Sequence, residues 1–175
     1  MLQGFFDEHG PEKQFYPRYE FSRLGHGYYM GLSIGDFLLA FRNGRLAGVA
    51  GVWDQGSFKS YRLLDAPATR APGGEDGVPA PRNAGSISPF FVHSILVEGN
   101  EPAVFADLLS WIMREYADSG RERIALGLDA KDPLLSALEG FTFKRFLSDH
   151  FLVTFGKDPR PALKPGVFYL EAARC

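Results

Sequence analysis

The chain has 175 residues, of which 45% are hydrophobic and 23% are charged, and its net charge is −2. This composition provides the apolar side chains for a globular core of one domain and excludes a largely disordered chain. The nearly balanced charge, without a long basic run, argues against a dedicated nucleic-acid binder. No apolar run reaches about 18 residues, so we expect no membrane span. The only cysteine, Cys175, cannot form an internal disulfide, which favours a reducing, cytoplasmic location.

The first 35 residues carry no clear strand pattern. Residues 1–9 are compatible with a short helical turn, and Pro17 interrupts an aromatic segment, which favours an extended course before it. Tyr16 and Tyr19 of that segment would either line a pocket or pack in the core. Four glycines between positions 25 and 35 then interrupt any regular helix or strand pattern. We therefore expect no strand before Phe37.

A β-hairpin is predicted around Asn43-Gly44. The apolar segments 37–41 and 45–53 flank this dipeptide, whose residues both tolerate a positive φ and suit a two-residue turn. Residues 56–65 fit either a short helix or a ragged strand. Residues 66–89 are rich in Pro and Gly and lack a periodic apolar pattern, so we predict a long loop that is either a functional lid or a tolerated insertion.

Next come a buried strand and a helix. The almost continuous apolar run at 90–97 fits a strand covered on both faces. Asn100 or Glu101 lies near the N-cap of the following helix, and Pro102 suits its first position. Apolar residues then recur at spacings of three and four up to Tyr116, which gives the helix one buried stripe.

The C-terminal third is predicted to contain three more strands and a short helix. A buried strand is expected at 123–128, and Asp132-Pro133 caps a short helix that ends at Gly140. Two strands follow at 141–146 and 151–155, and residues 167–170 are a candidate for a last one. The strand–helix–strand order at the centre implies a parallel crossover, with an antiparallel hairpin on each side. The expected fold is a mixed α/β (α+β) sheet with flanking helices.

Three local features resemble the GNAT superfamily of N-acetyltransferases. Residues 46–50 read Leu-Ala-Gly-Val-Ala, similar to that family's (I/L)-x-G-x-(A/V) strand. Residues 97–100 lie where the family has its acyl-CoA pyrophosphate loop, and Gly140-Phe141 resembles the G-F that follows its last helix. The segment from Trp53 to Gln55 is also similar to a divergent bacterial branch of these proteins.

The resemblance covers residues 36–156 and implies a domain organisation and a cofactor. Residues 1–35 would be a diverged N-terminal segment and residues 157–175 a C-terminal tail, while the sheet would contain a splayed pair of parallel strands. The cofactor would be acetyl-CoA, held by Ile95, Leu96, Val97, Gly99, Asn100, Ala103 and Asp129. Glu101 stands where the family has a small residue, so an acid is expected close to the phosphates.

The resemblance also implies direct attack of a substrate amine on the thioester. His93 is then a candidate base, although a hydrogen-bonded core histidine is the simpler interpretation. Glu98 is either a base acting through water or a solvated acid at a strand end. Ser136 occupies the position of the family's tyrosine acid and would hydrogen-bond the leaving thiolate.

The acceptor would be an amine of a small molecule or a peptide. Trp53 and Asp54 would hold it by cation–π contact and charge, or they would simply end the strand. Two other functions stay open: a non-catalytic module that binds CoA weakly or not at all, and an unrelated α/β protein with a coincidental strand order. A homodimer formed through exposed strand edges is a further option.

Overall fold

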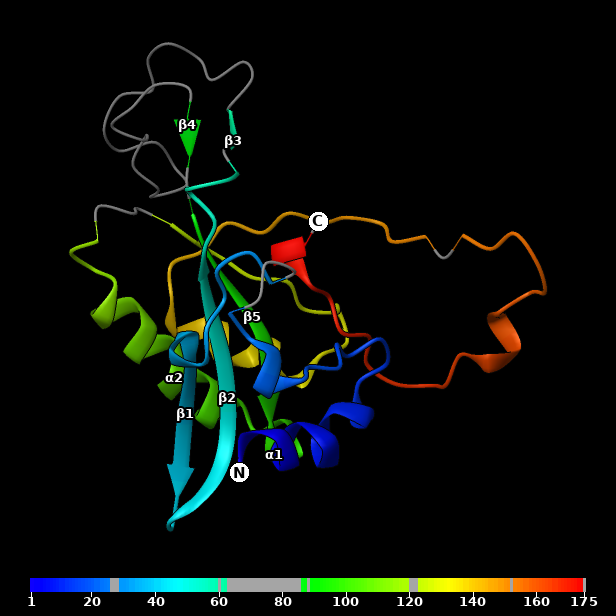
Figure 1. The fold of residues 1–175 in the computed structure, drawn as a ribbon, viewed down its shortest axis with the longest axis horizontal. Helices are drawn as coiled ribbons and strands as arrows, with labels where there is room; N and C mark the ends of the chain where they lie inside the picture. The colour runs from blue at the N-terminus through cyan, green and yellow to red at the C-terminus, as the bar shows by residue number, and fades with distance from the viewer. Residues whose placement is uncertain are drawn as a thin grey trace.

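A four-stranded mixed sheet with the order β1-β2-β5-β6 forms the centre of the molecule (Figure 1). It is seen in a computed structural model that describes residues 1–25, 29–59, 61–62, 86–87, 89–119, 123–151 and 153–174. The strands are β1 (Phe37–Arg42), β2 (Arg45–Asp54), β5 (Phe90–Val97) and β6 (Ile124–Ala125). β1 and β5 are antiparallel to β2, whereas β6 is parallel to β5. The expected mixed α/β class and the parallel central pair are confirmed.

The predicted hairpin is present. Asn43 and Gly44 have φ values of 50° and 75°, as a two-residue turn between twisted strands requires. Beyond the hairpin, β3 (Tyr61–Arg62) and β4 (Ser86–Ile87) form a small separate ladder. Residues 66–85 and 88 of the predicted long loop lie outside the described residues.

A β-bulge at Ser94 interrupts β5. Ser94 has a φ of 51°, and the register against β2 shifts by one residue between the pairs Gly51–His93 and Val49–Leu96. An extra residue in one strand reverses which residues face each side of the sheet. The side chains of β5 that face helix α2 are accordingly Phe90 and Val92 before the bulge and Ile95 and Val97 after it. All eight residues of β5 are buried, as the continuous apolar run predicts.

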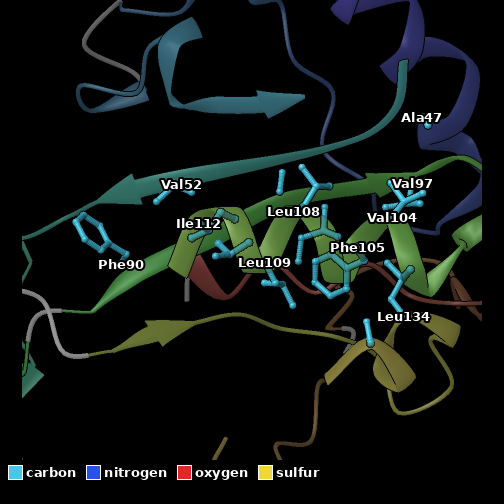
Figure 2. Close-up of a cluster of buried hydrophobic side chains, with 14 residues drawn as sticks. Ala47, Val52, Phe90, Val97, Val104, Phe105, Leu108, Leu109, Ile112 and Leu134 are labelled. Carbon is cyan, nitrogen blue, oxygen red and sulfur yellow. The ribbon is translucent and has the colours of Figure 1, made fainter. Parts of the chain in front are cut away.

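Helix α2 (Pro102–Glu115) covers one face of the sheet. Its buried stripe consists of Val104, Phe105, Leu108, Leu109 and Ile112, which pack against β2 and β5 (Figure 2). A Cβ atom on Gly48 of β2 would lie 2.7 Å from Val104 Cγ1. The glycine therefore allows the helix to approach the sheet closely.

The predicted short helix is a 3₁₀ helix over Pro133–Gly140, which packs beside α2 through Leu134 and Ala137. Asp132 caps it, because its Oδ1 accepts a hydrogen bond from Leu134 N at 3.0 Å. The Asp132 Oδ2 atom also forms an ion pair with Lys13 Nζ at 2.8 Å, and both side chains are only 2% exposed. This buried pair connects the N-terminal segment to the layer that contains α2.

Both ends of the chain cover the opposite face. Helix α1 (Leu2–His9) and the residues around it pack there, together with the C-terminal segment. Further 3₁₀ helices within the described residues are Gly10–Glu12, Phe21–Arg23, Ile34–Asp36, Glu98–Asn100, Arg160–Ala162 and Ala172–Arg174. The buried cluster on this face is mainly aromatic and contains Phe5, Phe6, Tyr19, Leu32, Phe37, Val49, Trp53, Phe91, Leu96 and Ala173.

The predicted strands after Gly140 are wrong. Among the described residues 141–151 and 153–155 there is no strand, because no neighbouring strand provides backbone partners. The strand expected at 123–128 is reduced to Ile124–Ala125, and the one expected at 167–170 to a single bridge between Phe168 and Gln14. The segment after Phe141 instead runs away from the sheet in an extended course (orange in Figure 1) before the chain returns.

Candidate functional site

The bulge in β5 creates a buried polar cluster. Ser94 N donates to Tyr169 Oη at 2.6 Å, and Tyr16 Oη donates to Ser94 O at 2.9 Å. The two tyrosines come from opposite ends of the chain and satisfy backbone groups that the bulge removes from the strand ladder. Tyr169 Oη in turn donates to Glu171 Oε2 at 2.8 Å.

His93, Ser94 and Tyr19 form a second set of hydrogen bonds in this cluster. Ser94 Oγ donates to Tyr19 Oη at 2.7 Å and lies 2.8 Å from His93 Nδ1. Because the hydroxyl hydrogen of Ser94 is directed to Tyr19, we assign the proton of this second contact to His93 Nδ1. A neutral His93 then keeps Nε2 as its basic atom.

His93 faces the inside of the molecule. Its side chain lies opposite Gly51, and a Cβ atom at that glycine would be 2.5 Å from Nε2. The imidazole also contacts the rings of Phe37 and Trp53, with centroids 5.6 and 5.8 Å away. Only 2% of the residue is exposed, so a substrate reaches Nε2 only after a covering segment moves.

The two tyrosines that hold Ser94 are poor acids. Burial raises the pKa of Tyr16 and of Tyr169 well above the ordinary value of 10.0, and the Glu171 carboxylate adds to both shifts. Both hydroxyls therefore stay protonated near neutral pH and act as hydrogen-bond groups.

The predicted phosphate loop turns sharply between β5 and α2. Gly99 and Asn100 have φ values of 63° and 50°, and in the described part of the chain no side chain caps the N-terminus of α2. Glu101 points to β1, where its carboxylate accepts a hydrogen bond from Arg42 Nη1. Glu98 lies 3.8 Å from Arg45 Nη2. An arginine of the hairpin thus partly compensates each acid of the loop.

The C-terminal segment lies against β5 and the residues that follow β6. Asp129 Oδ2 accepts a hydrogen bond from Phe168 N at 2.9 Å, and a Cβ atom on Gly127 would be 3.1 Å from Leu170 O. Asp129 therefore anchors the segment that carries Tyr169. Asp129, which was predicted to contact the cofactor, thus forms a hydrogen bond within its own chain.

Other predicted site residues are spread over the molecule. Ser136 is exposed and donates to Pro133 O at 3.0 Å, and Asp54 Oδ1 accepts from Gly56 N at 2.8 Å. Trp53 is buried in the aromatic cluster whereas Asp54 is exposed, because neighbouring strand residues point to opposite faces. The backbone-contact candidates Ile95, Leu96 and Val97 are at most 1% exposed, while Glu98, Gly99 and Ala103 are at the surface.

The structure thus brings together His93, Ser94 and three tyrosines, and separately groups the loop residues 98–103. Ser94, Tyr169 and Glu171 were absent from the predicted site. A serine inside an apolar strand is the one local signal that could have drawn attention to the bulge, and no local pattern links it to Tyr169, 75 residues away.

Comparison with known proteins adds no assignment. No protein-family model, curated protein or solved structure matches the chain. In the described ranges, no three His, Cys, Asp or Glu side chains are grouped to hold a metal ion. No helix in that part of the chain combines the length and apolar character needed to cross a membrane. The geometry of β5, its loop and the two chain ends is therefore the basis for any functional proposal.

Proposed function

We propose that the chain is an acyl-CoA-dependent N-acyltransferase with a GNAT-like arrangement, which moves an acetyl group to an amine of a small molecule or peptide. The observation that carries the proposal is β5 leading through a tight loop into α2, beside a parallel strand that pairs with β5 only at Phe90 and Phe91. Such an early end of pairing suits the splayed strands of this family. We also propose a cytoplasmic location, in line with the single Cys175.

The loop suits the diphosphate end of acetyl-CoA. The first N–H groups of a helix and its positive dipole end attract phosphate, and Gly99 permits the backbone turn that brings a ligand close. The acid expected to repel phosphate, Glu101, is directed to Arg42. Gly99, Asn100 and Ala103 are the proposed contacts.

The acyl end fits only if the C-terminal segment moves. Acetyl-CoA supplies an activated thioester, and the N–H of Ser94 is a donor that a carbonyl oxygen can use in place of Tyr169 Oη. The same movement of residues 167–173 would uncover the edge of β5 at residues 95–97.

The remaining roles follow the same proposal. His93 Nε2 is the proposed acceptor of the amine proton. Glu98 and Ser136 lie at the surface, outside the His93 cluster, and are not assigned to the reaction. Asp54 attracts the positively charged acceptor, and Trp53 borders its site.

A non-catalytic, ligand-binding module is the second candidate. Two observations favour it: the N–H of Ser94 is already used by Tyr169, and His93 is 2% exposed. In this case the loop at Gly99 binds a phosphate-containing ligand and no acetyl transfer follows.

Calorimetric titration with acetyl-CoA, combined with an assay of acetyl transfer to a panel of amines, tests both candidates. We expect binding by the full chain and its loss in Gly99→Glu, which places an acid and a side chain in the loop. Gly44→Glu is the matched control, because Gly44 also has a positive φ and open space around it but lies in the hairpin turn.

Each outcome of this experiment selects one interpretation. Binding with turnover that His93→Ala abolishes supports the acyltransferase, and binding without turnover supports the module. Tyr169→Phe, which removes the hydroxyl that occupies Ser94 N, should strengthen acetyl-CoA binding. An absence of binding by the folded wild-type chain at millimolar acetyl-CoA contradicts the acyltransferase; the module would then bind a phosphate-containing ligand other than CoA.

A further inference from the structure

The extended residues 143–151 and 153–155, here termed the arm, expose an unusual amount of apolar surface. The large apolar side chains among these described residues are 47–103% exposed: Phe143, Phe146, Leu147, Phe151, Val153 and Phe155. In Figure 1 the arm starts on the side of α2 and β1, passes the end of the sheet and extends out from the opposite side of the molecule. Polar contacts of its described residues are local, such as the one between Ser148 Oγ and His150 Nε2 at 3.0 Å. A patch of this kind marks an interaction site.

We propose that the arm pairs antiparallel with the same arm of a second copy of this chain, about a two-fold axis that passes through Leu147. In this register Phe143 of each copy lies opposite Phe151 of the other, and Arg145 lies opposite Asp149. All of these residues have odd numbers and therefore share one face of a strand. Opposite charges and paired aromatic rings at directly opposed positions stabilise antiparallel strands.

The charges of the arm favour a second copy over an anionic surface. Within the arm, Asp149 balances one of the two basic residues Lys144 and Arg145, and the remaining charge of +1 is far from the cluster of about 4–8 basic residues that binds anionic lipids. Prolines at 159, 161 and 165 follow the arm and prevent further strand growth. Charged residues and prolines beside an apolar strand also limit open-ended association.

Sedimentation velocity of the full chain over a wide concentration range tests the proposal. The expected mass is twice the monomer mass of 19.4 kDa. Arg145→Asp places like charges opposite each other twice in the pair and should weaken association about tenfold or more. Lys157→Glu, an exposed change of the same kind outside the register, should leave association unchanged.

The decisive measurement mixes two single variants. Arg145→Asp and Asp149→Arg each weaken their own pairing, but a mixture restores opposite charges between the two chains and should form a mixed pair. If residues 143–151 formed a hairpin within one chain, Arg145 would also lie opposite Asp149. Mixing the two variants would then not restore opposite charges, because both positions belong to the same chain. The proposal is overturned by a wild-type chain that stays monomeric or grows beyond two copies, or by variants that do not associate on mixing. Circular dichroism verifies that the variants, all at exposed positions, are folded.

Discussion

The two faces of the central sheet are covered in different ways. One face is covered by a single amphipathic helix, α2, whose apolar stripe packs closely against β2 at Gly48. The other is covered by segments from both chain ends, with aromatic rings and a buried hydroxyl network around Ser94. Local periodicity suffices to build the first face. The second depends on contacts between residues far apart in the chain, and it is also the face that contains His93.

The largest expected effect is on the helical face. Phe105 is fully buried at the centre of the α2 stripe, so Phe105→Ala should cost about 3–5 kcal/mol of unfolding free energy by leaving a cavity. Urea denaturation measures this change. Met113→Ala, on the exposed side of the same helix, should stay within about 0.5 kcal/mol of the wild type. Equal losses in both variants would contradict the assignment of the buried stripe.

Gly48 and Gly51 of β2 allow close packing on opposite faces of the sheet, so replacing each with alanine compares the two faces directly. Gly51→Ala should cost about 1–3 kcal/mol, because its Cβ would meet the His93 ring, and Gly48→Ala should cost a similar amount through Val104. His93→Ala should partly rescue Gly51→Ala and not Gly48→Ala, and Val104→Ala should do the reverse. Double-mutant cycles in urea give the coupling energies. Rescue of Gly51→Ala by Val104→Ala, or of Gly48→Ala by His93→Ala, would show that the two faces are not independent.

A smaller effect concerns alkaline pH. The raised pKa values of Tyr16 and Tyr169 mean that the folded state holds these protons more tightly than the unfolded chain, whose tyrosines titrate near 10.0. Their stabilising contribution is complete below that pH and is lost as the pH rises towards the folded pKa. The free energy of unfolding should therefore fall above about pH 10, and less steeply in Tyr169→Phe.

Tyr116 provides the control for this pH dependence. It packs against the α2 face, is partly exposed, and has a pKa that burial raises to a lesser degree. Tyr116→Phe should consequently change the alkaline slope less than Tyr169→Phe does. Identical slopes for the wild type and Tyr169→Phe would show that the buried hydroxyls do not control the alkaline transition.

Most elements with local signals could be predicted from the sequence. The hairpin at Asn43-Gly44, the buried strand at 90–97 and the helix after Pro102 depend on turn chemistry and periodicity, and all are present. The segments 141–146 and 151–155 have equally strong strand patterns, but their described residues form no strand. A strand needs a partner edge, and the edge at β6 is only two residues long. Apolar alternation therefore predicts the capacity to pair, not the partner.

The candidate site was less predictable for the same reason. His93 was identified from its residue type and strand, but its burial follows from Gly51 and from two chain ends that pack over it. Glu101 was expected to disturb an anion site, yet Arg42 from β1 directs it away. In both cases the deciding neighbour is distant in sequence, so local spacing carries no information about it.

The ion pair between Lys13 and Asp132 has a consequence for the order of folding. The two residues are 119 positions apart, so the lysine is synthesised long before its carboxylate partner. Until Asp132 is in place, burial of the Lys13 ammonium group would be strongly unfavourable, so the N-terminal segment stays exposed to solvent. We therefore expect the layer containing α2 to form first and the N-terminal segment to dock late, in a step slowed by closure of a long loop.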